Sequence, residues 1–242
     1  MELTNQHAVV TGSGKRLGRA IAESLLRQGM NLTAHYFQSS HEVDSLVQWA
    51  KSNNLGKVIP VQADLRNTDD IFKLGKYAQE KLGPAHLIVH SASDFYPTEI
   101  LTATSEAWDA FMSLNLKAAF FLTQQFVQNM SPGSQVIFIA DVHGSRPIPR
   151  YSPYCASKAG LISLTKTLAR ELAPRIRVNC ISPGTVLPQD HATSEEIQRA
   201  AQRSLLGRVG SPKDIVEGLL FLCRNDYITG LDLIIDGGRS LI

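Results

Sequence analysis

The sequence has few cysteines and almost no net charge. Three cysteines occur in 242 residues, and the formal net charge is +2. An odd number of cysteines without a C-x-x-C pair argues against a disulfide framework or a zinc site. The small and scattered charge gives no reason to expect a nucleic-acid or membrane surface. Neither a nucleic acid nor a membrane is therefore expected as a partner.

Long apolar runs and a secretory signal are also missing. The longest apolar stretches, such as 118–122, are far too short to cross a bilayer. The N-terminus, M-E-L-T-N-Q-H-A-V-V, lacks a basic start followed by an apolar segment. We therefore expect a cytoplasmic protein. An apolar content of 43% and a charged content of 19% are ordinary for a folded domain with a normal core.

Short apolar runs alternate along the chain with longer stretches of helical periodicity. Several runs are too continuously apolar for one side to face water, which is typical of central parallel strands. The alternation predicts an α/β fold, a single doubly wound Rossmann-type domain over residues 1–242. Its seven-stranded parallel sheet has helices on both faces, and the expected strands are 7–11, 32–36, 57–61, 86–90, 135–140, 177–181 and 231–236. Residues 184–203 follow the sixth strand and are expected to form a mobile substrate loop.

A glycine-rich turn, T-G-S-G-K-R-L-G, occupies residues 11–18 at the first junction of strand and helix. A helix N-terminus offers free N–H groups and a positive dipole end to an anion. Gly12 is expected to allow the tight turn, and Gly18 to let the helix approach the sheet closely. Cations at this end oppose the helix dipole, so Lys15 and Arg16 indicate an anionic partner, although solvated surface charge is the alternative. The turn predicts a dinucleotide pyrophosphate site.

The end of the second strand reads A-H-Y-F-Q-S-S and carries no acidic residue. NAD-specific folds usually place Asp or Glu there to bind the ribose hydroxyls. The neutral groups His35, Tyr36, Gln38 and Ser39 can donate to a 2′-phosphate without repelling it, which favours NADPH over NADH. At the end of the third strand, Asp64 is expected to accept a hydrogen bond from the adenine amine; the alternative is a helix N-cap for residues from 65 onward.

Tyr154 and Lys158 are four residues apart in Y-S-P-Y-C-A-S-K and would share one helix face. A phenol is a poor acid or base at neutral pH. An ammonium about 4 Å away would contribute roughly 4 kcal/mol at an effective dielectric constant of 20, which is about 3 pKa units. We therefore expect Lys158 to bring the Tyr154 pKa toward working pH, as a proton donor requires.

These motifs, together with S-L-N-L, V-N-C-I-S-P-G and the terminal I-T-G-L-D-L-I-I-D-G-G, resemble the short-chain dehydrogenase/reductase family over nearly the whole chain. The resemblance implies that Asn115 holds a helix kink and a water near Lys158, and that Lys158 also binds the nicotinamide ribose. It implies that Pro183 and Gly184 pack on the nicotinamide. It also implies a homotetramer that associates through helices at 105–130 and 153–172.

Three departures from the family pattern concern the substrate. Asp141 stands where the family has Ser, H-S-A-S replaces N-N-A-G, and Arg16 replaces the middle glycine of the turn. With D-F-Y-P-T after H-S-A-S, this combination resembles pteridine reductases and dihydromonapterin reductases. That resemblance implies that Ser93 binds the ligand, Phe95 stacks on a pterin, and Arg16 reaches the ligand across the cofactor phosphates.

The chemistry of Asp141 supports a pterin. An ionised carboxylate can only accept hydrogen bonds, so it cannot replace a Ser hydroxyl that donates to a carbonyl oxygen. It suits a substrate that presents N–H donors, as a pterin does with its ring nitrogens and 2-amino group. An anionic Asp141 would also push the Tyr154 pKa up and keep the phenol protonated, as reduction requires. The alternative is that Asp141 only caps or supports a loop.

The sequence thus predicts an NADPH-dependent pteridine reductase with catalytic residues Asp141, Tyr154, Lys158 and Asn115. One alternative is a carbonyl reductase of the same family, such as a 3-oxoacyl carrier-protein reductase. Another is a catalytically silent NADP-binding regulator. The predicted substrate contacts are Arg16, Ser93, Phe95, Asp141, Tyr154 and Leu187. The predicted cofactor contacts are Gly12, Lys15, Arg16, Leu17, His35, Tyr36, Gln38, Ser39, Asp64, Leu65, Ser91, Ala92, Ser93, Lys158, Pro183 and Gly184.

Overall fold

The protein is built on a seven-stranded parallel sheet with the strand order β3-β2-β1-β4-β5-β6-β7. The computed structural model describes residues 2–188 and 192–242. Strand interiors are fully buried in the middle of the sheet, which is why their sequences are continuously apolar. The predicted doubly wound α/β fold is confirmed. The strands are β1 (His7–Val10), β2 (Asn31–Tyr36), β3 (Val58–Gln62), β4 (Leu87–His90), β5 (Ser134–Ile139), β6 (Ile176–Pro183) and β7 (Asp232–Ile235).

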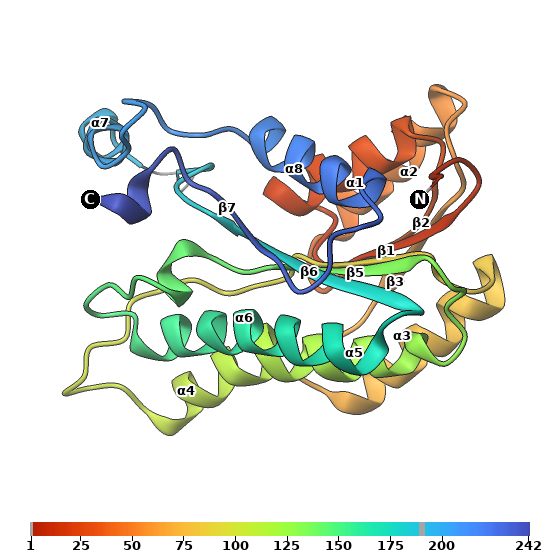
Figure 1. The fold of residues 1–242 in the computed structure, drawn as a ribbon, viewed down its shortest axis with the longest axis horizontal. Coiled ribbons are helices and arrows are strands. Elements are labelled where there is room, and N and C mark those ends of the chain that lie inside the picture. Colours follow the sequence, from red (N-terminus) through yellow and green to blue (C-terminus); the bar gives the residue numbers. More distant parts are fainter. Residues whose placement is uncertain (1, 189–191) are drawn as a thin grey trace.

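Helices cover both faces of the sheet (Figure 1). One layer consists of α1 (Arg16–Arg27), α2 (Ser40–Ser52) and α8 (Pro212–Arg224). The other consists of α3 (Thr68–Leu82), α4 (Ser105–Phe111), α5 (Ala118–Val127) and α6 (Ser152–Leu172). Each layer buries its own apolar cluster against the sheet. This burial removes most of the core from water and is the main stabilising contribution.

The predicted helix over 105–130 is interrupted. A π-helical turn, Met112–Lys117, separates α4 from α5. Within this turn the Asn115 side chain donates to Ser157 Oγ at 3.0 Å and accepts from the Asp94 backbone N–H at 3.2 Å. Widened turns of this kind are frequent at functional sites. The expected irregularity at Asn115 is confirmed, and the tetramer expected through these helices stays a prediction.

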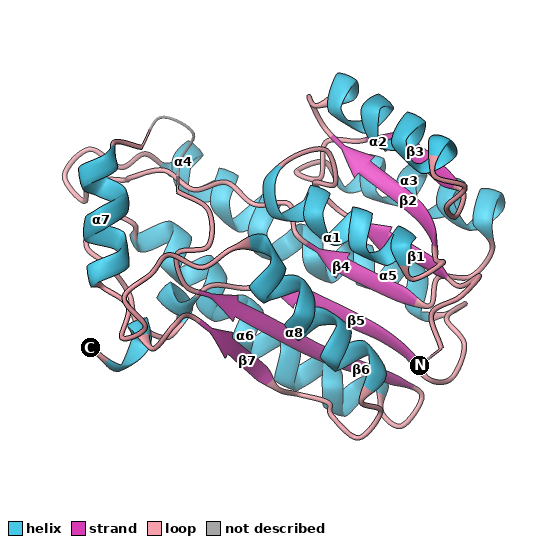
Figure 2. Ribbon diagram, turned by 90° about the horizontal axis from the view of Figure 1, so that it is seen from above, coloured by secondary structure: helices cyan, strands magenta, loops and turns pink. Residues whose placement is uncertain are grey.

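The carboxyl ends of the strands carry the remaining short elements. They include two short 3₁₀ turns, Val142–Gly144 and Arg239–Leu241, and helix α7 (Ser194–Gln202), which begins with a capping box between Thr193 and Glu196. Figure 2 shows α7 and the C-terminus at the same end of the molecule, as does Figure 1. Within the expected mobile loop 184–203, residues 189–191 lie outside the described residues, and its mobility stays a prediction.

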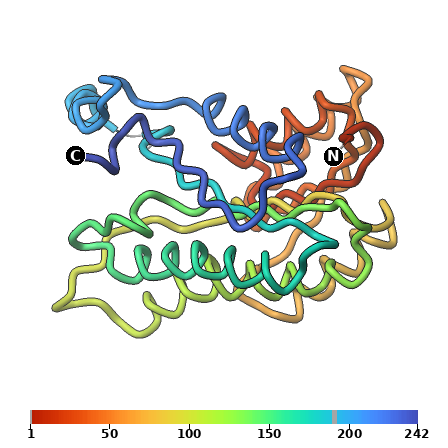
Figure 3. The backbone as a smooth tube through the Cα atoms, in the orientation of Figure 1, coloured from red at the N-terminus to blue at the C-terminus, as the bar shows by residue number. Residues whose placement is uncertain are grey.

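The strand order reverses at β1, which pairs with β2 on one side and β4 on the other. In open parallel sheets, ligands bind in the crevice outside the carboxyl ends of strands at such a point. Figure 3 traces the backbone from the red N-terminus to the blue C-terminus in the orientation of Figure 1. No helix in the described part of the chain is both long and apolar enough to span a membrane.

Candidate active site

A cavity of about 600 Å³ lies at the carboxyl edge of the sheet. Of the predicted residues, Gly12, Lys15, Arg16, Leu17, His35, Gln38, Ser39, Asp64, Leu65, Ser91, Ala92, Ser93, Phe95, Asp141, Tyr154, Lys158, Pro183, Gly184 and Leu187 all line it. Tyr36 and Asn115 are not among the lining residues. Tyr36 packs against the core on the α1 and α2 side of the sheet, and its contact with the cofactor stays a prediction.

The glycine turn has the expected tight geometry. Gly12 has a φ of +66°, in the region that favours glycine. A Cβ atom added at Gly18 would lie 2.1 Å from the backbone oxygen of Gly12. Because no side chain fits there, glycine allows α1 to start directly against the turn. The N–H groups at the start of α1 are thereby placed at the edge of the cavity.

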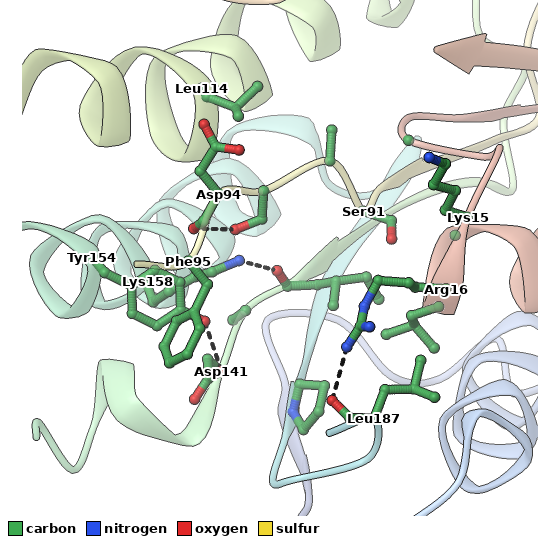
Figure 4. A pocket seen from close by; sticks show the side chains of 18 of the residues that line it. Lys15, Arg16, Ser91, Asp94, Phe95, Leu114, Asp141, Tyr154, Lys158 and Leu187 are labelled. Carbon is green, nitrogen blue, oxygen red and sulfur yellow. Dashed lines mark hydrogen bonds between the residues drawn. The ribbon is translucent and has the colours of Figure 1, made fainter. Parts of the chain in front are cut away.

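Arg16 connects this turn to the segment after β6. It adopts a φ of 51°, a backbone conformation that glycine reaches at lower cost. Its guanidinium donates to the carbonyl oxygen of Leu187 at 2.9 Å (Figure 4). It also donates to the carbonyl oxygen of Pro188 at 3.0 Å. The predicted contacts of Arg16 with cofactor phosphates and ligand therefore remain predictions. The neighbouring Lys15 forms a 2.9 Å salt bridge with Glu42 of α2.

The buried His35 side chain is hydrogen-bonded to the backbone of the glycine turn. Its Nδ1 accepts from the Gly12 backbone N–H at 3.1 Å, and its Nε2 lies 3.1 Å from the Ala63 carbonyl oxygen, to which it donates. Burial lowers the His35 pKa to about 4, so the ring is neutral. With both nitrogens engaged, the imidazole has no N–H left for a 2′-phosphate. The prediction of His35 as such a donor was therefore wrong, because the ring lies under the backbone rather than at the surface.

We expect acid to destabilise the fold through His35. The folded protein keeps the ring neutral down to a pKa of about 4, whereas the unfolded chain takes up the proton near pH 6.5. This stabilising contribution is complete above about pH 6.5 and is lost as pH falls toward about 4; buried His7, with a pKa of about 4, adds to it. Urea unfolding across this range should show a pH slope smaller by about one proton in His35→Gln, and unchanged in exposed His41→Gln. Equal slopes in all three proteins would contradict a buried neutral His35.

On the β3 side of the cavity, Asp64 does not cap a helix that begins at Leu65. Its Oδ1 accepts from the Arg66 backbone N–H at 3.0 Å, and α3 begins only at Thr68, with Asn67 as the side-chain cap. The alternative helix-cap role of Asp64 is therefore wrong, and its carboxylate borders the cavity. The contact with adenine stays a prediction. Sequence reasoning missed Arg66, which forms a salt bridge to Asp94 at 3.1 Å across this edge.

Asp141, Tyr154 and Lys158 meet at the centre of the cavity (Figure 4). The Tyr154 hydroxyl donates to Asp141 Oδ2 at 2.7 Å, and Asp141 Oδ1 accepts from the His143 backbone N–H at 2.8 Å. The Lys158 ammonium donates to the Ile139 carbonyl oxygen at 2.9 Å and lies 5.6 Å from the centroid of the Tyr154 ring. The carboxylate thus also caps the short turn after β5, as the alternative role of Asp141 requires, and its contact with a substrate stays a prediction.

The Tyr154 pKa is raised well above its ordinary value. Burial is the largest cause, followed by the charge of Asp141 and the hydrogen bond to it. The expectation that Lys158 lowers this pKa was wrong, because Lys158 faces the ring and a backbone carbonyl instead of the hydroxyl. Burial lowers the pKa of Lys158 itself to about 8. The expected effect of Asp141, a phenol kept protonated at neutral pH, is confirmed.

Aromatic rings form one wall of the cavity. Phe95 stacks on Tyr151, with centroids 4.6 Å apart and planes 12° apart, and meets the edge of Tyr154 at 4.8 Å. Phe95 is 42% exposed, so the ring offers surface to the cavity while its other contacts hold it in place. Tyr151 was missed by sequence reasoning, although its place in Y-S-P-Y-C-A-S-K could have indicated it. Ser93 Oγ donates to the Asp94 carbonyl oxygen at 3.3 Å.

Comparison with known proteins places this arrangement among nucleotide-dependent oxidoreductases. A family model described as Enoyl-(Acyl carrier protein) reductase matches residues 12–240. A 3-oxoacyl-[acyl-carrier-protein] reductase from Synechocystis sp. is 34% identical over 245 residues, which cover 99% of this chain and 98% of that protein. These names give no support to a pteridine-specific subgroup.

Solved structures have the same fold, and one of them contains NADP. A short-chain dehydrogenase/reductase from Serratia marcescens has a TM-score of 0.93 at 27% identity and covers 99% of this chain and 100% of that one. A short chain dehydrogenase from Burkholderia cenocepacia in complex with NADP has a TM-score of 0.92 at 26% identity, with 99% and 100% covered.

Proposed function

Since the chain belongs to the short-chain dehydrogenase/reductase family, we propose that it is an NADPH-dependent pteridine reductase. NADPH bound in this cavity would supply a hydride to the carbon of a pterin C=N bond, and a proton would reach the nitrogen, which would leave a CH–NH unit. The observation that carries the proposal is the Asp141 carboxylate beside the Tyr154 hydroxyl, at 2.7 Å, in the cavity. The fold of the family alone does not decide the substrate.

The residues at the sheet edge fit a dinucleotide phosphate. The turn at Gly12 and the start of α1 offer backbone N–H groups, and Lys15 lies beside them with Gln38 and Ser39 in the same cavity. The end of β2 has no carboxylate that would repel a 2′-phosphate. Lys15 can exchange its exposed partner Glu42 for that phosphate, because surface ion pairs are weak. The NADP in the Burkholderia relative supports the same choice.

Asp141 selects the substrate by its hydrogen-bonding capacity. An ionised carboxylate repels the lone pairs of a keto oxygen and accepts from ring N–H and amino groups. The Phe95 ring beside it offers a flat apolar surface that suits a planar heterocycle. Together these two side chains favour a pterin over an acyclic ketone.

Proton delivery falls to Tyr154. The phenol is protonated at neutral pH and lies within the cavity, so it can relay a proton to the reduced ring nitrogen. The Lys158 ammonium, held by the Ile139 carbonyl oxygen at 2.9 Å, lies 5.6 Å from the centroid of the phenol ring and keeps a cation in the cavity, while solvent restores the proton to the phenol. Asn115 does not contact the reacting groups in this structure; it positions the helix that carries them through Ser157.

A second candidate is a 3-oxoacyl carrier-protein reductase. The name of the Synechocystis relative and the description of the family model favour it over the pterin reading. It uses the same tyrosine and lysine, but it has to place a keto oxygen near Asp141. A catalytically silent NADP-binding regulator is a weaker candidate, since Tyr154, Lys158 and Asn115 are all present.

A single assay separates these functions. The protein is mixed with NADPH and dihydrobiopterin, or with NADPH and an acetoacetyl thioester, and the loss of NADPH absorbance is followed. We expect turnover with the pterin and at most slow turnover with the thioester. Turnover with the thioester alone would exclude the pteridine reductase. Turnover with neither substrate, together with measurable NADPH binding, would favour the regulator.

A further inference from the structure

Three arginines from distant parts of the sequence lie near one another close to the cavity. They are Arg146 after β5, Arg203 at the end of α7, and Arg239 in the C-terminal turn. The Arg146 guanidinium donates to the Arg239 carbonyl oxygen at 3.1 Å. The Arg239 guanidinium donates to Thr185 Oγ1 at 2.6 Å. Figures 1 and 2 show α7 and the C-terminal segment gathered at this end of the molecule.

Contacts through neighbouring residues fix this cluster to the cavity. His143 Nδ1 lies 3.1 Å from the carbonyl oxygen of Arg146, and both His143 and Thr185 line the cavity. Ser204, the residue after Arg203, donates to the Gly237 carbonyl oxygen at 2.9 Å. The C-terminal segment is therefore held against the end of α7. Arg239 and Arg146 are linked to the cavity wall through Thr185 and His143, respectively.

The cluster has an excess of positive charge. Burial lowers the Arg239 pKa most, and the positive charges of Arg203 and Arg146 lower it further, against the opposite effect of Asp141 and Asp236. The Asp236 carboxylate already accepts backbone N–H groups of Gly238 and Ser240. Across residues 2–188 and 192–242, no carboxylate forms a salt bridge with any of the three arginines.

Other arginines of this protein do have such partners. Arg66 pairs with Asp94 at 3.1 Å, and Arg208 pairs with Asp214 at 3.0 Å. An unpaired group of guanidinium ions at the edge of a low-dielectric cavity attracts anions, and the planar guanidinium matches a carboxylate or phosphate in two-point contacts.

We propose that Arg146, Arg203 and Arg239 bind an anionic substituent of the substrate, a carboxylate or phosphate attached beyond the reacting ring. The proposal rests on the proposed function and specifies its substrate class. Asp141 accepts hydrogen bonds from the donor edge of the ring, while the arginines bind the negative end. Because these two recognition elements are adjacent and opposite in charge, they fix the orientation of a long substrate in the cavity.

The test compares a neutral with an anionic substrate in the same variant. Arg146→Gln and Arg203→Gln are combined, and kcat/KM is measured with NADPH for dihydrofolate, whose tail carries two carboxylates, and for dihydrobiopterin, which has none. We expect the ratio of kcat/KM for dihydrofolate to kcat/KM for dihydrobiopterin to fall about tenfold in the double variant. This fall should be smaller at high salt. The matched control is Arg170→Gln, an exposed arginine in the last turn of α6 at the opposite edge of the sheet. An unchanged ratio in the double variant would overturn the proposal.

Failure of the proposed function would look different. If wild-type protein reduces neither pterin but reduces thioesters, the same ratio is measured with acetoacetyl-CoA, which carries phosphates, and the neutral N-acetylcysteamine thioester. If it reduces nothing, calorimetric binding of folate and biopterin to the NADPH-loaded protein replaces turnover. In each case a loss confined to the anionic member of the pair supports the arginine site, and equal losses or none refute it.

Discussion

Replacing Tyr154 by Phe should lower kcat for dihydropterin reduction by about 10²- to 10⁴-fold, the usual contribution of a positioned proton donor. The substitution removes only the hydroxyl that donates to Asp141 at 2.7 Å. The ring is buried and keeps its edge contacts with Phe95 and Phe111, so the fold should remain intact. The measurement is the rate of NADPH oxidation at saturating dihydrobiopterin.

Two controls make this result specific. Tyr227→Phe removes a hydroxyl from a side chain that is 99% exposed and should leave kcat unchanged. The affinity of Tyr154→Phe for NADPH, measured by fluorescence titration, should stay within about twofold of wild type. A phenol that is kept neutral contributes little electrostatic attraction to the negatively charged cofactor. If Tyr154→Phe turns over within about threefold of wild type, the proton comes from another group.

Replacing Asp141 by Ser should lower kcat/KM for dihydropterin about 100-fold and leave NADPH binding almost unchanged. Loss of a charge-assisted hydrogen bond inside a cavity costs about 1.5–3 kcal/mol, and a factor of 100 corresponds to about 2.7 kcal/mol. Ser restores the residue type that the family has at this position, so reduction of an acetoacetyl thioester should rise in the same variant. Asp141→Asn keeps the shape of the side chain but removes its charge and introduces an N–H donor. Comparison with Asp141→Ser therefore separates the effect of side-chain shape from the effect of the lost charge.

The pH dependence gives an independent test of Asp141. The charge of Asp141 and its hydrogen bond both raise the Tyr154 pKa, in addition to burial. Without them the phenol should ionise at lower pH, and the alkaline decline of kcat should shift toward neutrality in Asp141→Ser and Asp141→Asn. Unchanged pterin turnover and an unchanged alkaline decline would remove Asp141 from the mechanism.

Local patterns determined the fold and much of the cavity from sequence alone. Continuous apolar runs specify buried parallel strands, because a strand covered on both faces cannot tolerate alternating polar residues. The turn around Gly12 and Gly18 specified the close approach of α1 to the sheet edge, because only glycine fits where a Cβ atom would lie 2.1 Å from a backbone oxygen. The four-residue spacing of Tyr154 and Lys158 placed both on one helix face.

Side-chain direction and long-range contacts were decided only by the tertiary structure. The spacing of Tyr154 and Lys158 could not reveal that the ammonium binds the Ile139 carbonyl and that burial and Asp141 determine the phenol pKa. Sequence order likewise placed His35 at the cofactor, whereas packing turned its ring beneath Gly12. The arginine cluster joins three segments that are distant in sequence. Propensity and periodicity act over a few residues, whereas these contacts depend on which segments the closed core brings together.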